Sequence, residues 1–560
     1  MYWSIGLALF NLCLLSIVFF QRRRRQGEPP LVNHTLPFIG AALDFGKDPL
    51  NYLRNLQSKF GDVFTIKLAG WDTHVFMNPL DVRSLERAKF LGHQEIIGDF
   101  VTRMVGSPHS IHNHEHLAEI FPKNGKPKNP DQVLSPAADV QKKLTHSIEK
   151  NLRGSMQLNL LCSSCKPVVV NALHRTLGHT MNHHKPIKLH EFSKKLIFDI
   201  TFNLLFGSLP DYERASEETE RTYDVFKTYF KGSALLVDRI PIHLLPETKK
   251  ARGIFLKMME ELDWSKRENV SKLIDDIVKV NPKLEFLKQR ARHLMVVLWA
   301  AQANTTPALF WTLFYLIANP DAKRAVLEEY EQLRRQKMKH SSVRSEEKGW
   351  PTMKDILQIE RKDLDKLVIL DGCLRETMRL TGASMSIRKA TRDESIKTSD
   401  GKQYSVRRGD YTAFFAPVTH MDEDIYENPQ DFVHDRFLVS VDDTSSSCSS
   451  TDSDASSPYL NTDGRKFFGQ LKPRSRFTKN GQRVAVSRAI MTFGYGVTRC
   501  PGRHIALIEI KLAVLAMLGH FNVQFVDSNT KPPSFDLTHL GFGVMPPDTD
   551  IEVLIAPKCC

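Results

Sequence analysis

One cysteine in a glycine-rich loop, placed directly before an expected helix, constrains this chain of 560 residues more than any other feature. Gly494, Gly496 and Gly502 allow the loop backbone turns and close approaches that side chains would block. The apolar spacing that follows predicts a helix from His504 to Leu518. Cys500 therefore stands at a helix N-terminus, where unpaired N–H groups and the positive end of the helix dipole stabilise a thiolate. A thiolate held in this way is a good single axial ligand for haem iron, and its electron donation favours O–O cleavage.

The spacing Phe493-x-x-Gly496-x-x-x-Cys500-x-Gly502 matches the haem-ligand signature of the cytochrome P-450 superfamily, and the chain resembles that family. The resemblance implies the cytochrome P-450 fold, which is mainly α with a smaller β region. It also implies a haem b cofactor, with Cys500 as the axial thiolate and Phe493, Gly496 and Gly502 shaping the loop around it. Thr498 departs from the family pattern, because members usually carry an arginine there that pairs with a haem propionate.

A second motif lies on a helix that we predict from about residue 364 to 380. Glu376 and Arg379 are three residues apart, so they share one helix face and can pair. Such pairs are common on protein surfaces and mean little alone. The family resemblance implies that Arg436 joins them in a structural ion network behind the cysteine loop. It further implies that Arg388 contacts a haem propionate.

Residues 294–317 carry no charge, a length that would allow a membrane span. Polar side chains nevertheless cluster at 302–306, next to Pro307, which removes an intrahelical hydrogen bond and kinks a helix. We therefore expect a long buried helix with an opened turn that can bind O₂ and relay protons. In the resembled family this is the oxygen-binding helix. Thr305 retains the alcohol of its acid–alcohol pair and Asn304 replaces the acid, so both are candidate catalytic residues.

Asn304 also supports a narrower resemblance. The segment 298–305, with Pro307 and Phe310-Trp311 after it, is similar to the branch that contains sterol 7α-hydroxylases, sterol 12α-hydroxylases and prostacyclin synthase. That branch implies a haem-thiolate monooxygenase that hydroxylates the ring of a sterol or oxysterol with O₂ and NADPH-derived electrons. One alternative is a prostacyclin-synthase-like isomerase of a fatty-acid endoperoxide, and another is a non-catalytic haem sensor or carrier. Retention of Thr305 favours oxygen activation.

The N-terminus predicts a membrane anchor. The first twenty residues carry no charge, and Arg22, Arg23, Arg24 and Arg25 follow. This apolar stretch is just long enough to span a bilayer, and it lacks the basic start and cleavage site of a signal peptide. An arginine block on its C-terminal side stays cytosolic. We therefore predict a single-pass signal-anchor over 1–21 in the endoplasmic reticulum membrane, a basic, Pro-rich linker over 22–40 and a cytosolic haem-thiolate catalytic domain over 41–557.

Patterns along the chain agree with one mainly helical catalytic domain. Alternation predicts a strand within 59–71, helical periodicity dominates from about 131 to 360, and strand signals return at 391–415 and 541–555. Residues 441–463 contain a Ser-rich run that cannot pack, which predicts a surface insertion.

Two further motifs do not indicate a metal or redox site. Four histidines between 109 and 116 fit no defined metal spacing, and Cys162-x-x-Cys165 lacks a second cysteine pair. Cys559 and Cys560 are candidates for acylation.

Composition narrows the class and the partners. Charged residues make up 25% of the chain, which excludes a polytopic membrane protein, and eight cysteines are too few for a disulfide scaffold. The net charge of +13 indicates an anionic partner. From Gly464 to Arg503 there are ten Lys or Arg and no Asp or Glu. This basic segment predicts a docking surface for the acidic NADPH–cytochrome P-450 reductase, with a solvated basic face as the alternative. We expect membrane lipid as a second anionic partner. The sequence contains no nucleic-acid recognition motif, which argues against nucleic acid as a partner.

Overall fold

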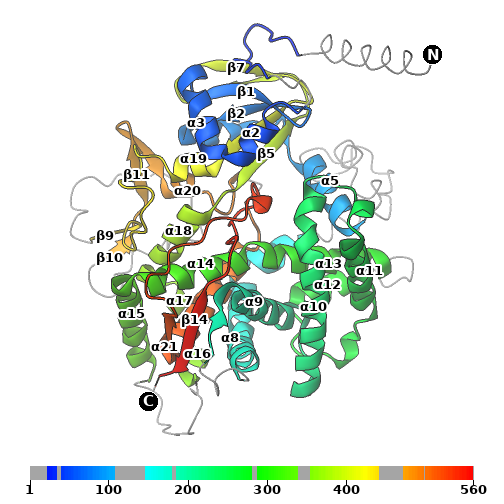
Figure 1. The fold of residues 1–560 in the computed structure, drawn as a ribbon, viewed down its shortest axis with the longest axis vertical. Coiled ribbons are helices and arrows are strands. Elements are labelled where there is room, and N and C mark those ends of the chain that lie inside the picture. The colour runs from blue at the N-terminus through cyan, green and yellow to red at the C-terminus, as the bar shows by residue number, and fades with distance from the viewer. Residues whose placement is uncertain are drawn as a thin grey trace.

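The structure, a computed structural model, describes residues 22–34, 39–106, 146–178, 185–279, 287–338, 353–440, 471–496 and 499–558. It is mainly helical with smaller sheets, as the sequence predicts, and its main sheet lies at one end of the long axis (Figure 1). No helix within those ranges combines the length and the apolarity that a membrane span requires. Several predicted features lie outside the described residues: the anchor over 1–21, the histidines at 109–116, the insertion over 441–463, Thr498, and Cys559 and Cys560.

The main sheet has five strands in the order β1-β2-β8-β5-β3, with only β2 and β8 parallel to each other. The strand predicted within 59–71 is confirmed as β1, which covers residues 63–68. Residues 59 and 60 end helix α3, and the chain turns at Ala69-Gly70 into a second strand. The strand bounds are β1 (Val63–Leu68), β2 (Trp71–Phe76), β3 (Leu91–Gly92), β5 (Met385–Ala390) and β8 (Tyr411–Phe415). Helices α2 (Ala42–Lys47) and α3 (Pro49–Phe60) pack beside this sheet.

The described part of the predicted linker lies along β1 and pairs with its backbone. The Val32 N–H donates to the Thr65 carbonyl at 2.9 Å, and the Ala41 N–H donates to the Lys67 carbonyl at 2.7 Å. The physical reason is that β1 is an edge strand, whose outer backbone groups are free to pair.

Arg22, the first of the four arginines, is bound to the sheet. Its side chain is only 6% exposed and donates to Asp410 at 2.6 and 2.9 Å. His74 Nε2 lies 3.0 Å from the same carboxylate, and Glu28 lies 3.3 Å from Arg22 and also pairs with Arg407. Burial alone would raise the pKa of Asp410, but hydrogen bonds from His74 and Arg22 outweigh it and lower that pKa to about 2. We call these five residues the Arg22 cluster.

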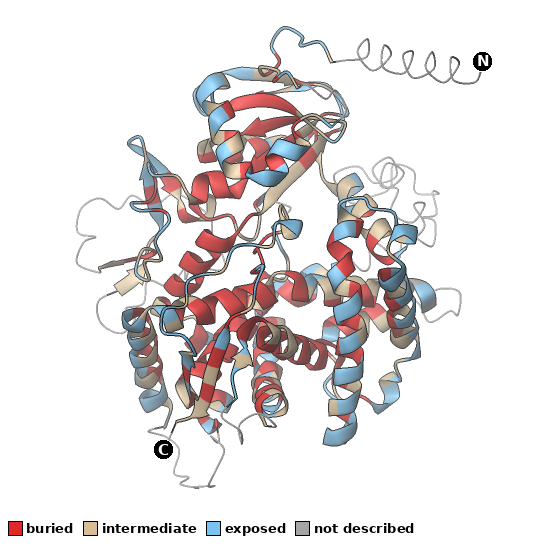
Figure 2. Cartoon of the chain, viewed as in Figure 1, coloured by how far each residue is buried: buried red, intermediate tan, exposed pale blue. Residues whose placement is uncertain are grey.

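The helical body is built around four buried helices (Figure 2): α9 (Leu189–Phe206), α14 (Thr305–Ala318), α18 (Val368–Thr381) and α21 (Arg503–His520). Helix α14 packs against the other three. Trp311 at its centre is fully buried, and its indole N–H donates to the Met545 carbonyl at 2.7 Å. The central position of α14 explains why its sequence is apolar all round.

Further helices surround this core, and small sheets complete the fold. The helices are α4 (Val82–Arg87), α5 (Gln94–Val105), α8 (Ser155–Leu177), α10 (Tyr212–Val237), α11 (Pro246–Glu261), α12 (Lys272–Lys279), α13 (Leu287–Ala303), α15 (Pro320–Met338), α16 (Lys354–Gln358), α17 (Arg361–Leu364), α19 (Ala416–His420) and α20 (Val486–Ala489). The strands are β4 (Ile187–Lys188), β6 (Glu394–Lys397), β7 (Gln403–Val406), β9 (Leu438–Ser440), β10 (Leu471–Pro473), β11 (Arg476–Lys479), β12 (Gln482–Ala485), β13 (Phe521–Phe525) and β14 (Glu552–Pro557).

The uncharged run 294–317 lies on two consecutive helices, and all of its residues except Ala300 are buried or half-buried. Helix α13 ends at Ala303 and α14 begins at Thr305, so Asn304 alone separates them. Pro307 lies in the first turn of α14, where its missing N–H leaves the Ala303 carbonyl without its helical donor. The predicted kinked, buried helix is confirmed.

Candidate functional site

The cysteine loop is closed by backbone hydrogen bonds. The Cys500 N–H donates to the Phe493 carbonyl at 2.8 Å, and the Arg499 N–H donates to the Gly496 carbonyl at 3.2 Å. Gly494 and Gly496 have φ angles of +71° and +58°, which side chains disfavour. Gly502 is the N-cap of α21, which begins one residue earlier than predicted and ends at His520. The loop therefore presents Cys500 at the start of a buried helix.

The groups around Cys500 shift the pKa of its thiol in opposite directions. Burial raises the pKa of its thiol, and backbone N–H groups of Gly502 and Arg503, together with the Arg503 charge, oppose this without overcoming it. Protein groups surround the sulfur closely enough to raise its pKa, yet part of the residue remains accessible to solvent. A metal cation deprotonates a thiol that ligates it. The pair of N–H donors would then stabilise the sulfur charge, so Cys500 fits a metal-ligand role.

Arg388 lies beside the same loop. It is a buried residue of β5, its Nη1 donates to the Leu85 carbonyl at 3.0 Å, and its guanidinium lies 4.8 Å from the centre of the Tyr495 ring. A Cβ atom at Gly496 would come within 3.1 Å of Glu86 and 3.4 Å of Arg388. The structure thus brings Arg388 and Gly496 together, and a guanidinium here fits an anionic carboxylate group such as a haem propionate.

Behind the loop, Glu376 is the centre of a buried ion network. Its carboxylate accepts two hydrogen bonds from Arg379 and one from Arg436, all at 2.8 Å, and one from the Val433 N–H at 3.1 Å. Glu376 and Arg379 are both fully buried. The predicted meeting of Glu376, Arg379 and Arg436 is confirmed.

His420 connects this network to the cysteine loop, and the sequence did not indicate it. Arg379 donates to the His420 carbonyl at 2.7 Å, and the His420 ring accepts from the Met491 N–H at 3.2 Å. The Met491 carbonyl in turn accepts from Gly494 in the loop at 3.0 Å. Burial and the Arg379 charge lower the pKa of His420 to about 3, so its ring stays neutral and can accept. Only the spatial contact identifies this residue, because its partners are far away in sequence.

Thr305 and Asn304 are neighbours with different environments. Thr305 is 5% exposed, and its hydroxyl has no hydrogen-bond partner among the residues that the structure describes. Asn304 Oδ1 accepts from the Val544 N–H at 2.8 Å, and its Nδ2 lies 3.5 Å from the Phe542 carbonyl. The carboxamide is therefore bound to the C-terminal segment, whereas the hydroxyl is available to a ligand.

Several features together fit a haem between the oxygen helix and the cysteine loop. Helix α14, which begins at Thr305, packs against α21, which follows Cys500. Ala300 is exposed near the C-terminal end of α13, although Leu298 and Gln302 on either side are buried, so this face of the helix is open at Ala300. Cys500 would ligate the iron, and Arg388 would pair with a propionate. These roles remain predictions, but the residues present are chemically suited to them.

The basic segment forms part of a separate small region. Strands β11 and β12 form a hairpin there, in which Arg476 and Arg483 are exposed. Lys479 is paired with Asp422 and so contributes less positive charge to the surface. The described part of the basic segment is therefore a partly neutralised surface.

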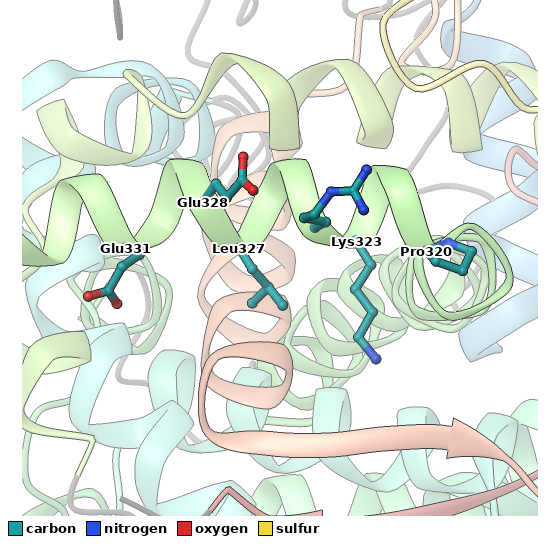
Figure 3. Close-up of a pocket in the computed structure, with 6 residues that line it drawn as sticks. Pro320, Lys323, Leu327, Glu328 and Glu331 are labelled. Carbon is teal, nitrogen blue, oxygen red and sulfur yellow. The ribbon is translucent and has the colours of Figure 1, made fainter.

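A depression of about 370 Å³ lies elsewhere, on the outer face of α15 (Figure 3). All its lining residues, among them Lys323, Leu327 and Glu331, come from that one helix. It contains none of the predicted site residues and has no enclosing wall.

Cys162 and Cys165 are not in surroundings that would make a thiol reactive. Both are buried on α8, and burial raises the pKa of each thiol.

Comparison with known proteins agrees with the family resemblance found in the sequence. The sequence model of the family described as cytochrome P450 matches residues 29–451 and 473–553. Cholesterol 7-alpha-monooxygenase of Cricetulus griseus is 29% identical, over 98% of this chain and 97% of that protein. The human 7-alpha-hydroxycholest-4-en-3-one 12-alpha-hydroxylase is 28% identical (97% and 95%), and the prostacyclin synthase of Rattus norvegicus is 27% identical (95% and 94%). The solved structure of retinoic acid bound cyanobacterial CYP120A1 shares the fold, with a TM-score of 0.61 at 16% identity over 96% of this chain and 100% of that one.

Proposed function

The chain belongs to the cytochrome P450 family, and from that premise we propose that it is a haem-thiolate monooxygenase that hydroxylates the ring of a sterol or oxysterol. The names of relatives that align along nearly the whole chain support the substrate class. The observation that carries the oxygenase assignment is Thr305, a residue that is 5% exposed at the break between α13 and α14 and whose hydroxyl has no hydrogen bond to the residues that the structure describes.

Each predicted site residue has a defined task in this proposal. When bound, the haem supplies the activation of O₂, which an axial thiolate promotes. Cys500 holds the iron, Phe493, Gly496 and Gly502 shape its loop, and Arg388 neutralises a propionate. Thr305 Oγ1 holds a proton where oxygen binds and passes it on. Asn304 has no acidic proton, so its task is to orient neighbouring groups.

Family membership implies a haem with thiolate ligation and a reductase as the electron source. We further propose that electrons come from NADPH through the flavoprotein NADPH–cytochrome P-450 reductase, which docks on the basic segment. Residues 1–21 anchor the chain in the endoplasmic reticulum membrane, and the catalytic domain faces the cytosol. Both the membrane and the reductase are anionic surfaces that suit a chain of net charge +13.

One observation favours a second candidate function. Asn304 replaces the acid of the oxygen helix and is already bound to backbone groups, as would suit a reaction that needs no delivered proton. The similarity to prostacyclin synthase points in the same direction. This alternative is an isomerase of a fatty-acid endoperoxide.

Electron demand separates the two functions. We expect a sterol such as cholesterol to shift the haem absorbance of the full-length protein, and its conversion to require both NADPH and reductase. Omitting either should abolish the product, because hydroxylation consumes two electrons for each O₂. Rapid turnover of an endoperoxide mimic without NADPH, with no sterol product, would instead establish the isomerase.

Thr305→Ala should uncouple oxygen consumption from hydroxylation. Removing a positioned proton donor lowers product per NADPH by roughly tenfold or more, while NADPH oxidation continues and hydrogen peroxide accumulates. Thr312→Ala is the matched control, because this buried threonine of α14 donates to the Ala308 carbonyl within its own helix. Equal coupling in both variants would move the proton role to another residue.

A further inference from the structure

Asn304 binds the turn formed by residues 541–545 through both ends of its carboxamide. Oδ1 accepts from the Val544 N–H at 2.8 Å, and Nδ2 lies 3.5 Å from the Phe542 carbonyl. Gly543, between them, has a φ of +142°, and a Cβ atom there would overlap Asn304 Oδ1. The turn therefore approaches the oxygen helix as closely as it does only because residue 543 has no side chain.

The same turn is also bound on its other side. The Ala383 N–H donates to the Gly543 carbonyl at 2.6 Å, and the Gly541 N–H donates to the Ala383 carbonyl at 3.1 Å. Residue 383 leads directly into β5, the strand that carries Arg388. The turn thus joins the break in the oxygen helix to the strand beside the cysteine loop.

Aromatic rings extend from this turn along the open face of α13. The ring of Phe542 lies 6.5 Å from that of His539, which lies 6.2 Å from Phe230 on α10. Phe230 lies 6.2 Å from Trp299 on α13, next to the exposed Ala300. All four rings are only partly buried. The position of the turn therefore fixes one end of a row of rings that an apolar molecule can contact.

The carboxamide of Asn304 is better suited to bind the 541–545 turn than the carboxylate of an acidic residue would be. A carboxamide has an acceptor and a donor, so it can serve the Val544 N–H and the Phe542 carbonyl together. An ionised carboxylate has acceptors only, and it would face the Phe542 carbonyl oxygen without a hydrogen between them. The departure from the acid–alcohol pair is thus explained by what the residue binds.

We propose that Asn304 is a positioning residue. Its carboxamide packs against Gly543 and holds the 541–545 turn over the break between α13 and α14. The turn in this position determines where the substrate ring lies relative to Thr305. This inference rests on the proposed function for the identity of the substrate. Residue 304 controls the site of hydroxylation through the turn and takes no part in ligating the haem.

The first test is hydrogen–deuterium exchange of the 541–545 segment in the full-length, haem-loaded protein. Asn304→Ala should raise exchange at the Val544 amide by about tenfold or more, because that amide loses its acceptor. Asn304→Asp should keep this protection, because it retains Oδ1. Gly543→Ala should mimic Asn304→Ala, and the double variant should add nothing further, because both changes break one contact.

Gly541→Ala is the matched control for backbone strain. Gly541 also has a positive φ, +89°, but a Cβ atom there would lie 3.8 Å from Met385 and away from Asn304. Protection of Val544 should therefore persist in this variant. Equal exchange at Val544 in the wild type and in Asn304→Ala would disprove the contact itself.

The second test is the distribution of products from cholesterol. Asn304→Ala, Asn304→Asp and Gly543→Ala should each change the ratio of hydroxylated positions, while the absorption of the reduced, CO-bound protein stays that of the wild type. An unchanged ratio in all three overturns the positioning role. If the wild type neither binds nor converts a sterol, the proposed function fails together with the substrate part of this inference, and the exchange result alone decides the contact between Asn304 and the turn.

Discussion

Cys500→Ser is expected to abolish the absorption at about 450 nm that thiolate ligation gives to the reduced, CO-bound protein. In the native chain the sulfur receives N–H groups from Gly502 and Arg503, at the start of a buried helix. A serine hydroxyl keeps nearly the same size but is far harder to deprotonate, so it does not supply the anionic ligand. The purified variant should therefore lose haem or show the spectrum of a different ligand.

Cys162→Ser is the matched control for this experiment. Cys162 is equally a free cysteine, but it is buried on α8 and burial raises the pKa of its thiol. Its replacement should leave the absorption at about 450 nm unchanged. A normal spectrum in Cys500→Ser would mean that another residue ligates the iron.

Glu376→Ala is expected to have the largest effect on stability. It leaves the Arg379 guanidinium, which is fully buried, without its carboxylate partner, and removes the anchor of Arg436. Losing one partner of a buried ion pair costs about 3–5 kcal/mol of unfolding free energy. Denaturant unfolding of the variant should show this loss, and haem retention should fall because the network reaches the cysteine loop through His420.

Glu331→Ala provides a matched comparison. Glu331 also pairs with two arginines, Arg334 and Arg335, each at 3.3 Å on one helix, but all three side chains are substantially exposed. Exposed pairs contribute roughly 0–1 kcal/mol, so this variant should unfold close to the wild type. Similar losses in the two variants would show that burial of the Glu376 network does not determine its contribution.

Short-range patterns predicted the local parts of the site well. The three-residue spacing of Glu376 and Arg379 placed them on one helix face, and the glycines around Cys500 marked a tight loop before a helix. The position of Arg436 came from family resemblance, because it meets Glu376 across 60 residues of sequence. Alternation within 59–71 located the centre of β1 but not its ends, which are determined by the end of α3 and the turn at residue 69.

Long-range contacts and burial account for what the sequence missed. Asn304 finds its partner at Val544, 240 residues away, and no local pattern encodes that distance. The helix N-terminus at Cys500 was visible in the sequence, but the groups that surround the thiol and raise its pKa were not. Both outcomes depend on which groups surround a side chain in space.

The Arg22 cluster determines where this chain can be shortened. A form that begins after residue 25 would remove the cation that lies against Asp410, Glu28 and Asp72. The buried Asp410 carboxylate would keep only His74 as a side-chain partner among these groups, at the start of β8, which pairs with the strand that carries Arg388. A form that begins at or before residue 22 keeps the charges balanced. Arg22, which belongs to a topology signal in the sequence, is therefore also part of the folded protein, and a shortened form should retain it.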